Sequence, residues 1–330
     1  YRAGHREQAR LHAATRGQAG LCYPWNSQRS GHEMVNWFFK ALDEQHVTLQ
    51  VAFAALQYDW LHDDDIIRRE EVWPIVSGVA DWVVSRVSRS ERGFEIRCMT
   101  GVSEESHNKD NNVFVNLHAQ TILREAVALA ERIGLQPRRS WQRVADGMVI
   151  PIRDGVLWRY DGYRPGEDAA HPEVLAALFP YRHRGIDAAT WRRSIRHYLD
   201  EADPYRGPML SQYYPVWACR IGDRAAARDW CQRGCTDFAV GPFLNVLEVI
   251  GKQASTYYPA TFHSMLIAHL FGFTGLDPDA GPVDGWARHP ITLPAGWNSV
   301  RMDNLHMRDA LVDLHAEQGD ERCRITIRKD

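Results

Sequence analysis

Apolar residues recur at intervals of three and four along most of the chain, which is the spacing of one face of an α-helix. The segment 72–87 shows this pattern most clearly, and Pro74 stands near its first turn, where a missing N–H is tolerated. In segment 49–62 the spacing predicts an apolar face made of Val51, Ala54, Ala55, Tyr58 and Leu61. The predicted helices, in chain order, are 1–20, 49–62, 72–87, 111–133, 141–148, 172–179, 188–201, 209–221, 224–235 and 259–271. They indicate a mainly α fold.

The pattern changes after Gly275. Prolines interrupt the helices there, and segment 322–327 alternates, with Cys323, Ile325 and Ile327 on one face. Segments 300–307 and 310–315 are its expected partners. The sequence therefore predicts a helical domain over residues 1–275 and a small β module over 276–330. Earlier extended segments are expected at 21–27, 94–98, 149–154 and 156–160.

Composition excludes several classes of function. A net charge of −3 and a pI near 6.6 give no basic surface for nucleic acid. The chain has no run of roughly 18 apolar residues, so the sequence predicts no membrane span. The 330 residues begin at Tyr1 without a charged and apolar leader, so we expect no targeting signal, and the first residue suggests an excised piece of a longer protein.

The six cysteines are scattered, and only Cys231 and Cys235 lie close together. A structural zinc site would need two further ligands at short spacing, and none is nearby. Buried free thiols are the simpler interpretation, which favours a reducing, cytoplasmic location. The sequence predicts no metal and no cofactor.

The stretch 100–116 is unusually polar for a segment between two apolar ones. One interpretation is a solvated helix N-terminus with Asp110 or Asn111 as its cap. The other is a catalytic loop that carries a carboxylic acid, for which Glu104 is the best candidate. The residues alone leave both interpretations open.

Polar, Trp-bearing loops between many helices suit an α/α barrel with a site at its mouth. Cleavage of a glycosidic bond needs a protonated carboxyl and a second carboxylate, which lie about 6.5–9.5 Å apart when the configuration inverts. Glu248 is the only carboxylate in the apolar run 242–251, although a solvent-facing glutamate would look the same. Trp25 offers a stacking face for a sugar, and Asn26 beside it offers a hydrogen-bonding amide; a packed Trp next to a turn residue is the alternative.

Five segments together resemble glycoside hydrolase family 65, which holds disaccharide phosphorylases, acid trehalases and glucosyl-galactosyl-hydroxylysine glucosidases. They occur in the family's order: Tyr23-Pro24-Trp25, Glu44-x-His46-Val47-Thr48, Gly101-Val102-Ser103-Glu104 followed by Asp110-Asn111-Asn112, Asp161-Gly162-Tyr163, and Phe271-Gly272-Phe273-Thr274-Gly275-Leu276.

The resemblance implies an (α/α)6 barrel whose first helices lie upstream of Tyr1, followed by a C-terminal β-sandwich module. It implies Glu104 as general acid and Glu248 as general base. The substrate-binding residues that it implies or supports are Trp25, Asn26, His46, Thr48, Glu105, Asp161 and His171. The implied partners are a small carbohydrate and either a second copy of the chain or an N-terminal β-sandwich segment.

The chain departs from the family at Ala170-His171-Pro172-Glu173, where the family has Lys-Gln-Ala-Asp. It also lacks the His-Gly-Ser-Ser run of the phosphorylases, since the corresponding residues 205–211 read YRGPMLS. We therefore expect inverting hydrolysis of an α-linked glucoside. The alternatives are an inverting disaccharide phosphorylase and a non-catalytic carbohydrate-binding relic of the same fold.

Overall fold

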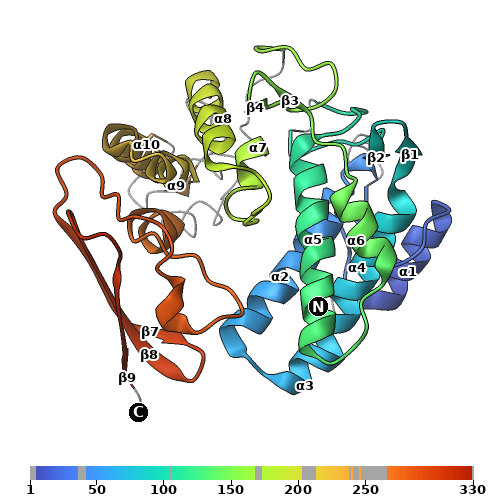
Figure 1. The fold of residues 1–330 in the computed structure, drawn as a ribbon, viewed down its shortest axis with the longest axis horizontal. Helices are drawn as coiled ribbons and strands as arrows, with labels where there is room; N and C mark the ends of the chain where they lie inside the picture. Colours follow the sequence, from blue (N-terminus) through green and yellow to red (C-terminus); the bar gives the residue numbers. More distant parts are fainter. Residues whose placement is uncertain are drawn as a thin grey trace. The chain divides into compact units, whose positions relative to one another are not determined.

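The computed structural model describes residues 5–35, 42–103, 106–167, 173–202, 213–237, 239–240, 245–246 and 266–328. The chain divides into two compact units, Tyr1–Asp59 with Asp63–Ser194 and Trp60–His62 with Ile195–Asp330. The chain as a whole is mainly helical with small antiparallel sheets, which confirms the predicted mainly α class (Figure 1). The closed barrel, the sandwich and the domain boundary at residue 275 stay predictions.

The first unit is built on helix α5, Val113–Arg132, which packs against α4, α6 and α7 (Figure 1). Every residue from Val113 to Leu123 is buried, so the N-terminal half of α5 has no solvent face. Some polar residues there bond internally: Gln120 Nε2, for example, donates to the Ala145 carbonyl at 2.7 Å. A helix buried all round is the core of its unit.

Further helices and two hairpins complete this unit. The helices are α1 (Arg6–Thr15), α2 (His46–His62, whose last three residues belong to the second unit), α3 (Asp65–Ile67), the π-helix η3 (Arg68–Val72), α4 (Trp73–Arg86), α6 (Arg139–Asp146), α7 (Glu173–Ala176) and the first half of α8 (Ala188–Glu201). Two hairpins pair β1 (Ser88–Ser90) with β2 (Gly93–Glu95) and β3 (Ile152–Arg153) with β4 (Val156–Leu157). The helix predicted over 172–179 is shorter, because turns replace it after Ala176.

Helix α2 buries a different face from the one that its apolar spacing predicts. The buried side carries Leu49, Ala52, Phe53, Leu56 and Trp60. The predicted face is half-buried or exposed: with residues of α3, η3 and α4 it lines an open groove of about 720 Å³. The spacing predicted an apolar face but not the buried one, because α2 is apolar on two sides and spacing alone could not choose between them.

A buried ion cluster closes the C-terminal end of α5. The carboxylate of Asp59 accepts from Arg68 Nε at 2.7 Å and from Arg132 Nη1 at 2.9 Å. Its side chain is only 1% exposed. Both arginines neutralise a charge that could not be buried alone.

In the second unit, helices α9 (Tyr213–Arg220) and α10 (Arg224–Thr236) pack as a pair, and α9 also contacts the π-helix η4 (Ala268–Phe273). A short hairpin joins β5 (Ala239–Val240) to β6 (Asn245–Val246). Of the helix predicted over 259–271, residues 259–265 lie outside the described part.

The C-terminal residues form one antiparallel sheet in the order β7-β8-β9, after the 3₁₀ turn η5 (Val283–Trp286). Its strands are β7 (Ser299–Met307), β8 (Ala310–Glu317) and β9 (Arg324–Arg328). Val312, Leu314 and Ala316 alternate inward along β8. The three predicted strands are confirmed within a few residues at each end.

Candidate active site

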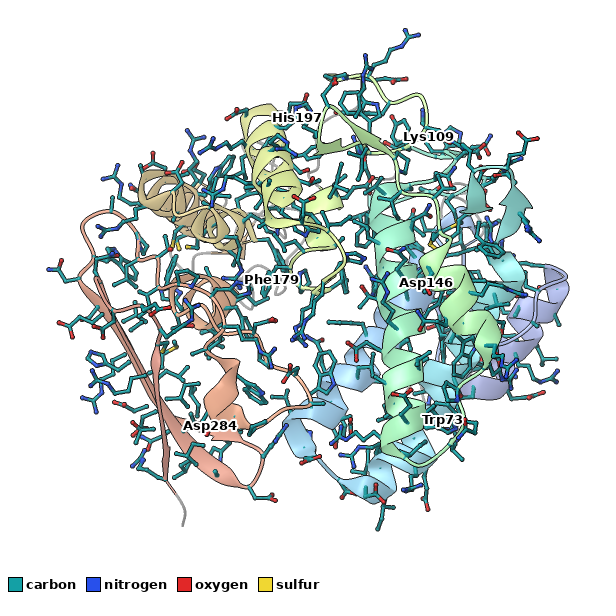
Figure 2. All side chains as sticks on the ribbon, in the orientation of Figure 1. Trp73, Lys109, Asp146, Phe179, His197 and Asp284 are labelled. Carbon is teal, nitrogen blue, oxygen red and sulfur yellow. The ribbon has the colours of Figure 1, made fainter. Side chains whose placement is uncertain are left out.

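The segment that carries Glu104 is closed at its base. Met99 and Lys109 exchange two backbone hydrogen bonds of 2.9 Å, so residues 100–108 form a loop that leaves and returns at one point. We call it the acid loop. Lys109 lies near the N-terminal end of α5 (Figure 2). The Thr100 N–H donates to the Asp43 carbonyl at 3.1 Å, which ties the start of the acid loop to the segment before α2.

Glu173, the first residue of α7, binds the acid loop directly. Its Oε2 accepts from the Ser103 N–H at 3.1 Å. Its Oε1 accepts from Asn112 Nδ2 at 2.9 Å and from Arg159 Nε at 3.1 Å. Both partners of the ion pair are fully enclosed, with 0% of the Glu173 side chain and 1% of the Arg159 side chain exposed. Such a buried charge persists only when it is paired and hydrogen-bonded.

Asn112 connects this carboxylate to α5. It is the N-cap of the helix, because its Oδ1 accepts from the Val115 N–H at 3.1 Å. The cap predicted at Asp110 or Asn111 was therefore wrong. Asn111 takes a left-handed backbone conformation, with φ at 52°, and its side chain turns to other partners. Gly101 completes the contact, because a Cβ atom there would overlap the Glu173 carboxylate and the Asn112 amide.

His46 borders the acid loop from the start of α2. Its Nδ1 lies 3.3 Å from the Thr100 carbonyl oxygen, which can only accept, so this nitrogen carries the proton. Burial lowers the pKa of His46 to about 4, although the charge of Glu173 opposes that shift. Thr48 is fully buried and binds the segment that contains Tyr23: its Oγ1 accepts from the Tyr23 N–H at 2.9 Å.

Asp161 lies beside the segment that follows the acid loop, within a network of charges. Its Oδ2 accepts from Arg92 Nη2 at 2.5 Å and from Asn111 Nδ2 at 2.9 Å. Burial favours the neutral acid, but these hydrogen bonds outweigh it and lower the pKa of Asp161. Glu95, which is bonded by Ser90, Arg92, Arg97 and Asn111, likewise has its pKa lowered. Both carboxylates are thus ionised near neutral pH.

Trp25 and Asn26 are held through their backbone. Their N–H groups donate to the carboxylate of Glu33, at 2.7 and 3.1 Å. The side chain of Trp25 is half-buried, and that of Asn26 is exposed. The segment is thus fixed while the amide of Asn26 stays accessible.

The structure brings His46 to the acid loop through Thr100. Asp161 instead bonds to the residues just after that loop, Asn111 and the Asp110 carbonyl. The side-chain hydroxyl of Thr48 bonds to the segment around Tyr23, not to the described residues of that loop. Glu104, Glu105, His171 and Glu248 lie outside the described residues, so their roles stay predictions. The run 205–211, where the phosphorylase motif was sought, also lies outside them.

Sequence reasoning missed the pair Glu173–Arg159. A signal was present, because Glu173 occupies the acidic position of the family's Lys-Gln-Ala-Asp segment. Its buried partner lies 14 residues earlier, beyond any local pattern.

All six cysteines lie in the described part of the chain and none forms a disulfide; Cys22, Cys219, Cys231 and Cys323 are buried. The neighbouring Cys235 and burial both raise the pKa of Cys231. In the part of the chain that the structure describes, no three His, Cys, Asp or Glu side chains are grouped so that they could hold a metal ion. Among the described helices, none combines the length and apolar character needed to cross a bilayer.

Comparison with known proteins defines the class as a glycosyl hydrolase. Residues 1–171 match the model of the glycosyl hydrolase family 65 central catalytic domain. The chain belongs to glycosyl hydrolase family 65, which confirms the resemblance seen in its motifs.

Two curated relatives illustrate the similarity. A kojibiose hydrolase of Flavobacterium johnsoniae is 29% identical over 311 residues, which cover 92% of this chain and 45% of the relative. A protein-glucosylgalactosylhydroxylysine glucosidase of Gallus gallus is 31% identical over 282 residues, which cover 83% of this chain and 40% of the relative. The chain thus spans less than half the length of these proteins.

A solved structure, a putative kojibiose phosphorylase from the human microbiome, shares the fold. It superposes with a TM-score of 0.73 at 12% identity, over 99% of this chain and 52% of the other. At that identity the likeness concerns the fold alone.

Proposed function

We propose that the protein hydrolyses an α-linked glucoside with inversion of configuration. The Glu104 carboxyl donates its proton to the glycosidic oxygen as the bond to the anomeric carbon breaks. The Glu248 carboxylate takes a proton from the water that attacks the opposite face of the sugar. The products are β-glucose and the free aglycone.

The observation that carries the proposal is the anchoring of the acid loop. The Ser103 N–H is bound by a buried carboxylate, and the next residue along the chain is Glu104. A general acid must be held within hydrogen-bond reach of the leaving oxygen, and a loop fixed this close to it meets that need. The hydrolase and glucosidase relatives support the same class of reaction.

The stereochemistry of the first product tests the mechanism. Proton NMR of a fresh digest of kojibiose, trehalose or a glucosyl-galactose should show β-glucose before mutarotation. The reaction should not require phosphate. Early α-glucose would contradict inversion, and release of glucose 1-phosphate only when phosphate is present would establish the phosphorylase instead.

Substitution tests the contribution of each carboxyl group on its own. Glu104→Gln and Glu248→Gln should each lower kcat by about 10²-fold or more, because each removes proton transfer in the transition state. Circular dichroism should show both variants folded. Activity unchanged in folded Glu104→Gln would reject Glu104 as the acid, and a parent protein inactive on every α-glucoside would favour the carbohydrate-binding relic.

A further inference from the structure

We propose that Glu173 is a positioning residue for the general acid: its buried carboxylate holds the backbone next to Glu104 and thereby aims the acid at the leaving oxygen. The inference rests on the proposed function, because it takes Glu104 to be the acid.

The contact lies one residue from the proposed acid. Ser103 is fixed through both of its backbone groups: its N–H donates to Glu173, and its carbonyl accepts from the Ser106 N–H at 3.0 Å. Ser103 and Ser106 are buried, with 1% and 0% of their surface exposed. The two residues between them, 104 and 105, are therefore bracketed by immobilised neighbours. A shift of Ser103 would move the Cα atom of residue 104 with it.

The arrangement requires a carboxylate. One oxygen accepts from the acid loop, and the other accepts from Asn112 and Arg159. Glutamine has the same shape, but it would turn an NH₂ group toward one of these sets of donors, so one side would lose its acceptor. The guanidinium of Arg159 compensates the charge that the site must bury.

The Glu173 carboxylate also links the acid loop to a rigid element, helix α5. Asn112 bonds Glu173 with its side-chain nitrogen and caps α5 with its side-chain oxygen. Because the first turns of α5 are buried on every side, this cap is a fixed point. Gly101 allows the acid loop to approach so closely that no side chain fits between it and Glu173.

A purely structural ion pair would behave differently, and the chain offers one for comparison. Asp59 is equally buried and is bonded by Arg68 and Arg132 at the other end of α5. Since α5 has 20 residues, the two ends lie about 30 Å apart. Asp59→Asn is therefore the matched control for loss of a buried carboxylate.

The test uses two substrates that differ in their need for an acid. A disaccharide must receive a proton on its leaving oxygen, whereas fluoride leaves without one. Misplacing the acid should therefore slow hydrolysis of kojibiose and spare that of α-glucosyl fluoride. A general loss of structure slows both alike.

We expect Glu173→Gln to lower kcat for kojibiose by about 10²-fold, with KM little changed, and to lower kcat for α-glucosyl fluoride by less than about threefold. Asp59→Asn should leave the ratio of the two rates as in the parent. Gly101→Ala, which displaces the carboxylate but keeps both charges of the ion pair, should change the ratio in the same direction as Glu173→Gln.

Equal losses on both substrates, or no loss in folded Glu173→Gln, would overturn the inference. If Glu173→Gln does not fold, the ratio in Gly101→Ala decides. Glu104→Gln, measured in parallel, tests the proposed function separately: it should show the same selective loss. If it does not, Glu104 is not the acid, whatever Glu173 does.

Discussion

At the scale of single residues, the first unit buries three neutral histidines. Burial lowers the pKa of His46 and of His183 to about 4, and that of His118 well below its ordinary value. His118 stacks on Tyr181 at 3.9 Å between ring centroids, and neither of its ring nitrogens has a hydrogen-bond partner in the described part of the chain. Such a ring has nothing to stabilise its charged form.

The stability of the protein should therefore fall as the pH drops below neutral. In the unfolded chain each histidine takes up a proton near pH 6.5, whereas in the folded protein it stays neutral until a lower pH. The unfolded state thus binds more protons between about pH 7 and pH 4, and acid favours it. Urea titrations at pH 7 and pH 5 measure the effect.

His118→Phe isolates one contribution. It keeps a flat ring against Tyr181 but cannot bind a proton, so the loss of unfolding free energy between pH 7 and pH 5 should shrink by about 2 kcal/mol. An unchanged difference between the two pH values would show that His118 is not neutral in the folded protein.

At the scale of elements, α2 shows how a helix can be apolar on two sides. Leu56 is 1% exposed and Leu61 is 39% exposed, although the two leucines belong to the same helix. The side that carries Leu56 packs into the core, while Ala54 and Tyr58 line the groove described above. The side that carries Leu56 therefore contributes the free energy gained by burying apolar surface.

The two leucines make a matched pair for measuring that difference. Leu56→Ala should reduce the free energy of unfolding by about 2–5 kcal/mol, because it leaves a cavity. Leu61→Ala should cost less than about 1 kcal/mol, because water already reaches the side chain. Chemical denaturation of both variants measures the two costs, and similar costs would mean that the exposed side of α2 is covered in solution.

Local patterns predicted most of the helices and the C-terminal strands. Segment 188–201 coincides with α8, and 111–133 contains α5, because apolar spacing is a property of neighbouring residues. The face of α2 and the cap of α5 could not be predicted in the same way. The first depends on what packs against the helix. The second depends on Asn111 turning toward Glu95 and Asp161, residues far from it in sequence.

In the candidate site, too, local motifs predicted some features and missed those that depend on distant residues. The motifs drew attention to residues 100–116 and to His46, which the structure places beside one another through Thr100. They could not reveal that Glu173 binds Ser103 across 70 positions of sequence. Tertiary packing determines which charged residues form a buried ion pair, and a single sequence does not show which arginine pairs with which carboxylate.

At the scale of the whole molecule, Arg308 joins distant parts of the second unit. Its backbone N–H donates to the Leu61 carbonyl at 3.0 Å, and its Nε donates to the Trp60 carbonyl at 3.0 Å. Its Nη2 donates to the Gly281 carbonyl at 2.8 Å, and the guanidinium lies 5.4 Å from the Trp286 ring centre. One side chain thus connects the end of α2, the η5 turn and the β7–β8 hairpin.

Arg308→Ala should lower the stability of the second unit by about 2 kcal/mol, because charge-assisted hydrogen bonds to several carbonyls are lost together. Arg301→Ala is the control, since Arg301 is exposed on the same sheet and bonds only its near neighbour Asp303 among the described partners. Its effect should stay within about 0.5 kcal/mol. Thermal melting followed by circular dichroism would reveal the contrast, and equal melting temperatures would contradict it.

The division of α2 between the two units limits how the chain can be cut into fragments. A fragment that stops at residue 194 would keep Trp60 and Leu61 but lose Arg308, which donates hydrogen bonds to their carbonyls. A fragment that starts at residue 195 would keep the arginine and lose both acceptors. Neither piece would hold the whole second unit, so refolding and truncation experiments have to treat residues 60–62 as members of the C-terminal half.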